Sequence, residues 1–500
     1  MVLVARRNRS LIVGRLKGSI GRGLSAVPPV VLGLFGVGLL LRILVMVLYS
    51  NVTLTYYGGD SARYMRLPFT GFHGLFSDPF IPAGYPAFLH VARWVSHNIV
   101  FTIGLQHLMG IGTAALLLLA LRRLGAPWWA ASIAAIVPLL SGDHLFLEAS
   151  ALTETLWMLF LAAGVWATFS ASPYPASPSR LALAGVFFAL SATVRIISLP
   201  FALFVAVWVA WDHDGRMRDR LRFAGVLLVP ALIVLGCYIG VARLEHGYAG
   251  FTDMSGFNLY GRVAEFADCK DFTAPAGTHA LCNDVPLSRR DEGVFYYTFD
   301  PSSPYYRAGF VQIPRDAAIA GRFARAVIEH EPLQYLKTVA KDFARYVAPY
   351  AIVVPKLSGI PPSGMSFANT VPQAQGASPA QLASEYSVKY SHVDRSLPSQ
   401  GIRDLLGGYQ EIFRLNGLAL VVLALMAVAG PLVTRGHVRR ASILLLLFTA
   451  YLYVAPVALL QYDVRFGVPA GLMLAAAAGI GAWGAADRLR GRFGRQPLPV

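Results

Sequence analysis

Charge is scarce in this chain. Asp, Glu, Lys and Arg make up only 14% of its 500 residues, whereas 55% are hydrophobic. A soluble globular protein carries about 25% charged residues. The deficit argues against a soluble protein and predicts an all-α integral membrane protein.

Acidic residues are scarcer than basic ones, with 27 Asp and Glu against 43 Lys and Arg. An excess of base can indicate a nucleic-acid-binding surface, but here the bases cluster in short connectors between apolar runs. That distribution is the positive-inside pattern of membrane proteins. We therefore expect membrane lipid, and no nucleic acid, as a partner.

Apolar runs long enough to cross a bilayer, which takes about 20 residues, recur along the chain. About ten are candidate spans, of which 199–212 is the weakest. They are 27–50, 98–121, 127–142, 151–169, 181–197, 199–212, 223–243, 413–433, 441–460 and 466–486.

Ten crossings place every arginine-rich connector on the side of the N-terminus, which we therefore expect to be cytoplasmic. The basic N-terminus, 1–26, and the basic tail, 487–500, would both lie there. The run 27–50 is too long for the apolar core of a cleaved signal peptide, so we expect a retained first helix. The prediction is a multi-pass plasma-membrane protein.

Two long segments lack any spanning run, and both fall on the predicted outer face. The first is the loop 51–97, inside a membrane module 27–243. The second is the extracytoplasmic segment 244–412, which precedes the C-terminal transmembrane helices 413–486. Within the loop, 61–76 and 84–97 mix apolar and polar residues at helical spacing, which predicts short amphipathic helices in the membrane interface.

Cysteine is rare, with three in the whole chain. Cys269 and Cys282 lie thirteen positions apart in the outer segment. Outside the cytoplasm such a pair can close a disulfide, and two free thiols are the alternative. Cys237 lies in an apolar run, where we expect it to be packed.

Ionisable residues near the predicted outer face are candidates for function, because burying them at membrane depth is costly. They come from four separate places in the sequence. They are Asp60, Arg63 and Arg66; Asp143, His144, Glu148 and Glu154; Arg195; and Arg465. Arg42 differs because it lies inside the first span, where it needs a partner within the helix bundle.

A carboxylate beside arginines suits group transfer from a lipid phosphate. Arginine binds phosphate oxygens with a planar fork and stays charged. An acceptor hydroxyl needs a carboxylate to take its proton as it attacks. Asp60 would be this base, and Arg195 and Arg465, with Arg63, would hold the phosphate and stabilise its growing charge.

Each of these residues also has a structural explanation. Asp60 is a favoured cap for a helix that begins at Ser61. Arg63 and Arg66 are suited to lipid headgroups. Side chains at the ends of spans can snorkel to the interface, which would account for Arg195 and Arg465.

The short outer loop at residues 141–154, called here the second outer loop, has its own alternatives. His144 and Glu148, four positions apart, could share a face toward a metal ion, although a packed or solvated helix entrance is the simpler explanation. Glu154 opens an apolar helix, where the helix dipole favours an acid.

Several short motifs together resemble the GT-C superfamily of polytopic glycosyltransferases, in its protein-O-mannosyltransferase and aminoarabinose-transferase-like branch. They are GGDSARYMRLP with Asp60, GYPAFL with Tyr85, LFLEASALTETLW with Glu148 and Glu154, ATVRIISLP with Arg195, EHEPLQYL with Tyr335, and QYDVRFGVP with Arg465. The resemblance covers about 27–245 and 411–486. The central segment is similar to that of actinobacterial lipid-carrier-dependent relatives.

This resemblance implies an inverting transfer of one sugar from a polyprenyl-phosphate donor to an extracytoplasmic glycan, lipid or protein. It implies that Asp60 is the general base and that Tyr85 lies near the site. Relatives that bind a divalent ion commonly carry paired acids, and Asp60 has no second acid beside it. A divalent metal is therefore not favoured, and no cofactor is certain.

A polytopic transporter or lipid-carrier flippase is the alternative. Transporters often show two related halves, with ionisable residues near the midplane. This sequence has no internal repeat, and its polar candidates gather at one face, which favours the enzyme. A polytopic scaffold, a third interpretation, would not need the acid at Asp60.

Overall fold

The computed structural model describes residues 27–49, 60–67, 71–170, 177–290, 293–349, 365–368, 390–391 and 398–493. The predicted basic N-terminus, 1–26, and the end of the tail, 494–500, lie outside these residues. Apart from one bridge between Asn98 and Ser391, the regular elements of the described residues are all helices. The all-α prediction is confirmed for this part of the chain.

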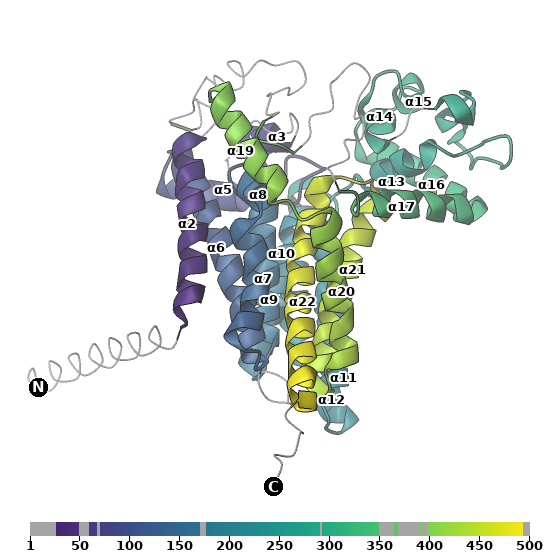
Figure 1. The fold of residues 1–500 in the computed structure, drawn as a ribbon. Coiled ribbons are helices and arrows are strands. Elements are labelled where there is room, and N and C mark those ends of the chain that lie inside the picture. Colours follow the sequence, from purple (N-terminus) through teal and green to yellow (C-terminus); the bar gives the residue numbers. More distant parts are fainter. Residues whose placement is uncertain are drawn as a thin grey trace, which may run out of the picture.

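Each predicted span coincides with a helix of one elongated bundle (Figure 1). These helices are α2 (Pro29–Leu48), α6 (Ile99–Arg123), α7 (Trp128–Leu140), α9 (Glu154–Thr168), α10 (Pro178–Val194), α11 (Phe201–Asp212), α12 (Met217–His246), α20 (Gly417–Val433), α21 (Gly436–Leu459) and α22 (Val464–Phe493). In the described residues, six helical stretches are long and apolar enough to cross a membrane. The number is seven if α7 and the bent continuation α8 (Gly142–Glu148) form one span. Helices α9, α10 and α11 are apolar but shorter.

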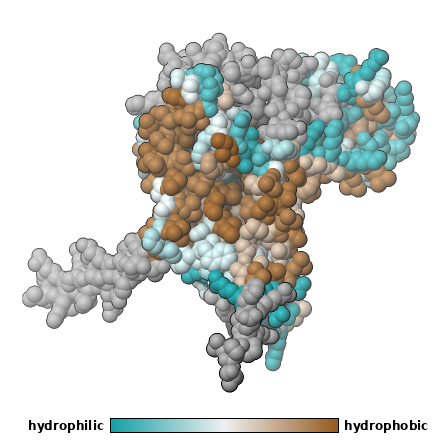
Figure 2. Space-filling model, viewed as in Figure 1, coloured by the Kyte–Doolittle hydropathy of each residue, from teal (hydrophilic) through white to brown (hydrophobic). Residues whose placement is uncertain are grey.

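The bundle exposes apolar side chains over a broad band, with hydrophilic surface above and below it (Figure 2). On α2, Val30 is 82% exposed and Leu40 is 55% exposed, and on α20 Leu418 is 79% exposed. Soluble proteins rarely expose apolar patches of this extent. The band fits a helical protein embedded in a membrane.

Helix α22 forms the centre of the bundle and packs against α20, α21 and α7. Its run Ala475–Ala478 is fully buried. A Cβ added to Gly481 would lie 1.8 Å from the carbonyl oxygen of Met426 on α20. Small residues of this kind let helix backbones approach closely in a membrane, so the sequence of α22 determines how tightly the bundle closes.

Several arginines of the basic connectors bind helix ends. Arg123 Nη1 and Arg180 Nη2 donate to the Trp166 carbonyl, at 2.8 Å and 3.0 Å. Arg488 donates to the carbonyls of Leu432 and Val433, at 2.6 Å and 2.8 Å. The last carbonyls of a helix have no partner within it, so these arginines stabilise helix ends as well as carrying charge.

The opposite end of the bundle carries a cap, defined here as the described residues within 247–349 (Figure 1). Its helices are α13 (Ser255–Ala264), α14 (Val294–Phe299), α15 (Pro304–Arg307), α16 (Pro314–His330) and α17 (Pro332–Arg345). A separate apolar cluster, including Phe257, Tyr260 and Phe323, holds the cap together. We call this end of the bundle the cap end.

Short helices from the predicted outer loop also lie at the cap end, together with α19 (Gln400–Ile412). The stretch 84–97 contains α5 (Gly84–Val95), which buries Tyr85 and Leu89 and leaves Trp94 84% exposed. The stretch 61–76 contains two pieces, α3 (Asp60–Arg66) and α4 (Gly71–Leu75). Short helices are therefore present in both stretches, and α5 has the predicted amphipathic character.

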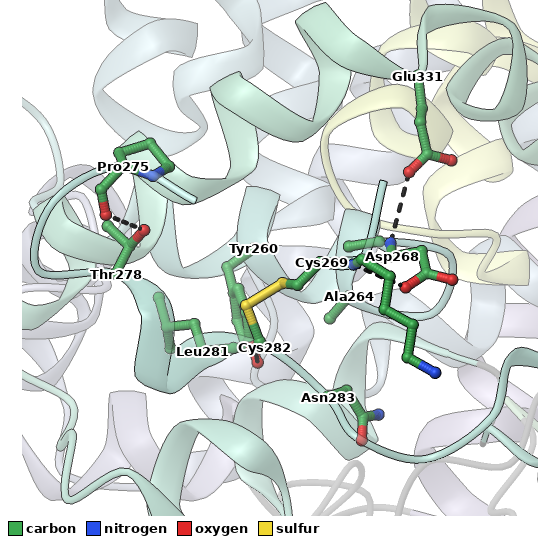
Figure 3. Close-up of a disulfide and its surroundings, with 12 residues drawn as sticks. Tyr260, Ala264, Asp268, Cys269, Pro275, Thr278, Leu281, Cys282, Asn283 and Glu331 are labelled. Atoms are coloured by element: carbon green, nitrogen blue, oxygen red, sulfur yellow. Dashed lines mark hydrogen bonds between the residues drawn. A yellow bond between two sulfur atoms is a disulfide. The ribbon is translucent and has the colours of Figure 1, made fainter. Parts of the chain in front are cut away.

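Cys269 and Cys282 form a disulfide, with their sulfur atoms 1.99 Å apart (Figure 3). The bond closes a loop beside α13, where the Tyr260 hydroxyl donates to the Leu281 carbonyl at 3.3 Å. Asp268 N donates to Glu331 Oε1 at 3.4 Å, which connects the loop to the junction of α16 and α17. The loop thus joins two parts of the cap. Cys237, expected to be packed, is instead exposed on α12, because that helix lies at the surface of the bundle.

Replacing both bonded cysteines, Cys269→Ser with Cys282→Ser, is expected to destabilise the cap by about 3 kcal/mol, because the crosslink restricts the unfolded chain. Hydrogen exchange of the full chain would measure this, with faster exchange across α13 and unchanged exchange in α22. Cys237→Ser is the matched control and should change neither. Unchanged exchange in the cap of the double variant would contradict the prediction.

Candidate functional site

Four ionisable side chains of the described residues meet at the cap end, each from a different element. Asp60 begins α3, Glu154 begins α9, Arg195 follows α10, and Arg465 lies in the first turn of α22. Arg465 Nη1 lies 2.7 Å from Asp60 Oδ2. Arg465 Nε and Arg195 Nη1 both donate to Glu154 Oε1, each at 2.5 Å. We call these four residues the Asp60 cluster.

Within the Asp60 cluster, solvent exposure is highest at Asp60 and lowest at Glu154. The Asp60 side chain is 41% exposed and that of Arg195 is 19% exposed, whereas Arg465 is only 4% exposed and Glu154 is fully buried. A buried charge is stable only when it is paired. Glu154 therefore fixes both arginines from below, while Asp60 can be reached from outside the protein.

Neighbouring groups hold the two arginines in position. The Arg195 guanidinium lies 5.4 Å from the ring centre of Trp157 and 5.5 Å from that of Phe466, within the range of cation–π attraction. The backbone N–H of Arg465 donates to Asp463 Oδ1 at 3.0 Å. The cluster is thus a set of charges whose geometry is fixed by packing.

Electrostatics keep Asp60 ionised. Burial opposes the charge of this carboxyl, but the Arg465 guanidinium attracts it and donates to it, and the charges of Arg63 and Arg195 add to the effect. The net result is a pKa of Asp60 below its ordinary value. Burial, with the charge of Asp60, raises the pKa of Tyr64 on the same helix, so its hydroxyl stays protonated.

Arg63, another candidate on α3, pairs with an acid outside this cluster. Arg63 Nε lies 2.9 Å from Asp78 Oδ2, and its guanidinium lies 4.6 Å from the ring centre of Phe80. Arg63 thus acts on Asp60 through its charge alone. The side chain of Arg66 lies outside the described part of the structure.

Tyr85 supports the site from below. Its ring packs edge-on against Tyr64, with centres 5.0 Å apart. Its hydroxyl donates to Gln106 Oε1 at 2.8 Å, and Gln106 Nε2 donates to the carbonyls of Glu148 and Ser150, both at 2.8 Å. Tyr85 therefore connects α3 and α5 to the turn that precedes Glu154.

Glu148 lies in a separate buried cluster. Arg42 Nη2 lies 2.6 Å from Glu148 Oε1, and His107 Nδ1 lies 2.8 Å from Oε2. Arg42 also donates to the carbonyls of Pro138, at 2.8 Å, and Leu139, at 3.1 Å, beside the 55° bend between α7 and α8. The prediction that Arg42 needs a partner within the bundle is confirmed.

Glu148, the acid of the suggested His144–Glu148 metal pair, is thus bound to Arg42 and His107. His144 is buried, and its Nε2 finds no hydrogen-bond partner among the described residues. No group of three or more His, Cys, Asp or Glu residues in the described ranges could hold a metal ion. Among the residues that the structure describes, none thus assemble a metal site around Glu148.

Asp143 is bonded elsewhere, to Arg414 Nη2 at 3.1 Å and Gln410 Nε2 at 2.8 Å. Asp143, His144 and Arg414 line a pocket together with Arg345 and residues of α21 and α22. The pocket does not include Asp60 or Glu154. The candidates of the second outer loop are thus divided among three places.

Arg42→Met is expected to destabilise the protein by about 3–5 kcal/mol, because it leaves the buried carboxylate of Glu148 with a single partner. The double variant with Glu148→Gln should recover most of this loss, since the uncompensated charge is gone. Thermal unfolding in detergent would measure both. Arg243→Met, at the exposed end of α12, is the control, and an equal effect there would contradict the assignment.

Gln106 and His107 were missed in the sequence, although two adjacent polar residues within an apolar span were a signal that could have found them.

Comparison with models of protein families finds none that matches this chain, and comparison with curated proteins finds no match either. Function therefore has to be inferred from the residues themselves.

Proposed function

We propose that this protein is a membrane glycosyltransferase. It moves one sugar, with inversion, from a polyprenyl-phosphate donor to a hydroxyl of an extracytoplasmic glycan, lipid or protein. One observation carries the proposal: the partly exposed, ionised Asp60 contacts Arg465, and a buried Glu154 holds both Arg465 and Arg195 in place. This arrangement supplies a base and an anion site at one point.

The chemistry divides between these residues. Asp60 accepts the proton of the acceptor hydroxyl as its oxygen forms a bond to the anomeric carbon of the sugar. The bond from that carbon to the phosphate oxygen breaks, and the electron pair leaves with the lipid phosphate. Arg465 and Arg195 stabilise the additional negative charge on this phosphate.

The Asp60–Arg465 contact couples donor binding to the strength of the base. A donor phosphate that binds Arg465 competes with Asp60 for Nη1, the atom that lies 2.7 Å from Asp60 Oδ2. Once Asp60 loses this contact and the phosphate brings its own negative charge, the pKa of Asp60 rises toward its ordinary value. A higher pKa makes the carboxylate a better proton acceptor, so the base strengthens when the donor is in place.

Two features support an extracytoplasmic location for the cap end. The Cys269–Cys282 disulfide belongs to the cap, and disulfides persist in oxidising compartments. The arginines that bind helix ends lie at the other end of the bundle, as the positive-inside pattern requires on the cytoplasmic side. Both termini would then be cytoplasmic.

A transporter or flippase would need ionisable groups along a path through the membrane. The buried Arg42–Glu148–His107 cluster is the observation that such a function would use. However, Arg42 binds the carbonyls of Pro138 and Leu139 at the bend of α7 and α8, so the cluster already has a structural role. The enzyme remains the better proposal.

The direct test uses the purified full chain in lipid nanodiscs with a polyprenyl-phosphate hexose or pentose and an envelope extract as acceptor. A transferase releases free polyprenyl phosphate and attaches the sugar to the acceptor. A transporter leaves the bond between sugar and phosphate intact. Movement of the intact donor across the membrane of liposomes that contain the protein, without release of polyprenyl phosphate, would overturn the proposal.

A further inference from the structure

Helix α17 carries an apolar stripe that the described residues leave partly exposed. Leu333 is 72% exposed and Leu336 is 58% exposed. Phe343 is 40% exposed, and one edge of its ring meets Tyr453 of α21, with ring centres 6.4 Å apart. Val347, directly after the helix, is 42% exposed. Residues at these spacings lie along one side of a helix, so they form a continuous surface, which we call the α17 stripe.

The opposite side of α17 is fixed to the protein. Asp342 is buried and accepts from Arg262 of α13 at 2.6 Å. The Tyr335 hydroxyl donates to the Ala458 carbonyl of α21 at 2.9 Å. These contacts anchor the helix on both the cap and the bundle, and they leave the α17 stripe facing outward.

The position of α17 matches the boundary of the apolar band. Ala458 belongs to the last turn of α21, and the next residue, Leu459, is 54% exposed. Helix α17 therefore contacts the bundle where the apolar surface of α21 ends (Figures 1 and 2). A bilayer around the band would bring its headgroup region to the level of α17.

Two lysines add positive charge to α17 at the level of the headgroups. Lys337 and Lys341 are exposed and lie one turn apart, to one side of the α17 stripe. Lysine on the flank of an apolar helix face can extend to lipid phosphates, while the apolar side chains enter the boundary of the acyl chains. An amphipathic helix with basic residues on its flank favours anionic lipid over neutral lipid.

We propose that α17 lies on the membrane surface as an anionic-lipid-binding helix that anchors the cap. Leu333, Leu336 and Phe343 enter the acyl-chain boundary, and Lys337 and Lys341 bind the phosphates of anionic phospholipids. The proposal requires only a membrane-embedded bundle. It is independent of the transferase activity.

Fluorescence quenching by brominated lipid tests the position of the stripe. In a Cys237→Ser background that keeps the disulfide, a small fluorophore is attached to Leu336→Cys or, as the matched control, to Gln334→Cys, an exposed position off the stripe. In vesicles with brominated acyl chains, we expect position 336 to lose most of its fluorescence and position 334 to lose little. Equal quenching at both positions would overturn the proposal. So would a 336–336 disulfide between two copies of the unlabelled Leu336→Cys variant, together with no quenching of the labelled one.

The lipid preference has its own measurement. Vesicles contain phosphatidylglycerol and phosphatidylcholine in equal amounts, and the bromine is placed on only one of them. We expect the label at position 336 to be quenched more by brominated phosphatidylglycerol, and this preference to disappear in the Lys337→Gln, Lys341→Gln double variant. Equal quenching by the two lipids with both lysines present would overturn the anionic preference.

Discussion

Asp60→Asn is expected to lower sugar transfer by about 10²–10⁴-fold, the usual contribution of a general base. Asparagine has nearly the same shape but cannot take the proton of the acceptor hydroxyl. It is also a good residue at a helix start, so α3 should remain folded. Release of polyprenyl phosphate from a labelled donor would measure the rate, and size-exclusion chromatography would confirm intact protein.

The control for this variant makes the same chemical change at another acid. Asp404→Asn alters an exposed side chain of α19 that accepts from Gln400 at 2.6 Å. We expect transfer by this variant to equal that of the unmodified protein. If Asp60→Asn also keeps its full rate, Asp60 is not the base. The protein would then be a transferase that uses another residue as its base.

Arg465→Gln is expected to lower kcat/KM for the donor by about 10²–10³-fold, because it removes a fixed positive charge from the departing phosphate. Arg195 remains on Glu154 in this variant, so the buried carboxylate keeps one partner. Steady-state kinetics at varied donor concentration would measure the loss. Arg465→Lys should lose less, because it keeps the charge but not the planar fork that reaches both Asp60 and Glu154.

The pH profile of these variants tests the link between Arg465 and Asp60. The base must be ionised, so transfer is present above the pKa of Asp60 and is lost as the pH falls through it. Arg465 holds this pKa below its ordinary value, and Arg465→Gln should therefore move the acid limb of kcat/KM to higher pH. Arg465→Lys should move it less. An unmoved limb in Arg465→Gln would mean that Arg465 does not control Asp60.

The sequence predicted at which end of the bundle each charged residue lies better than it predicted which residues its side chain contacts. Span boundaries placed Asp60, Glu154, Arg195 and Arg465 at one end, and the structure brings these four together. Which residue meets which could not be read, because Glu154 and Arg465 are 311 positions apart. Their contact depends on the rotation of α9 and α22 about their axes, which packing decides.

The second outer loop illustrates the same limit. His144 and Glu148 share a helical spacing, but the bend between α7 and α8 turns Glu148 toward Arg42 and His107. Asp143, one residue before His144, instead meets Arg414, 271 positions away. Adjacent residues thus serve different parts of the molecule, which the local pattern could not separate.

The central place of α22 has a consequence for biogenesis. This helix is the last of the bundle's described helices to leave the ribosome, yet it carries Arg465 and packs against α20, α21 and α7. A nascent chain therefore holds Asp60 and Glu154 without Arg465 until translation of α22. Insertion of that helix closes the bundle and completes the Asp60 cluster at the same time. Partly synthesised chains in the membrane would therefore lack the proposed transferase activity.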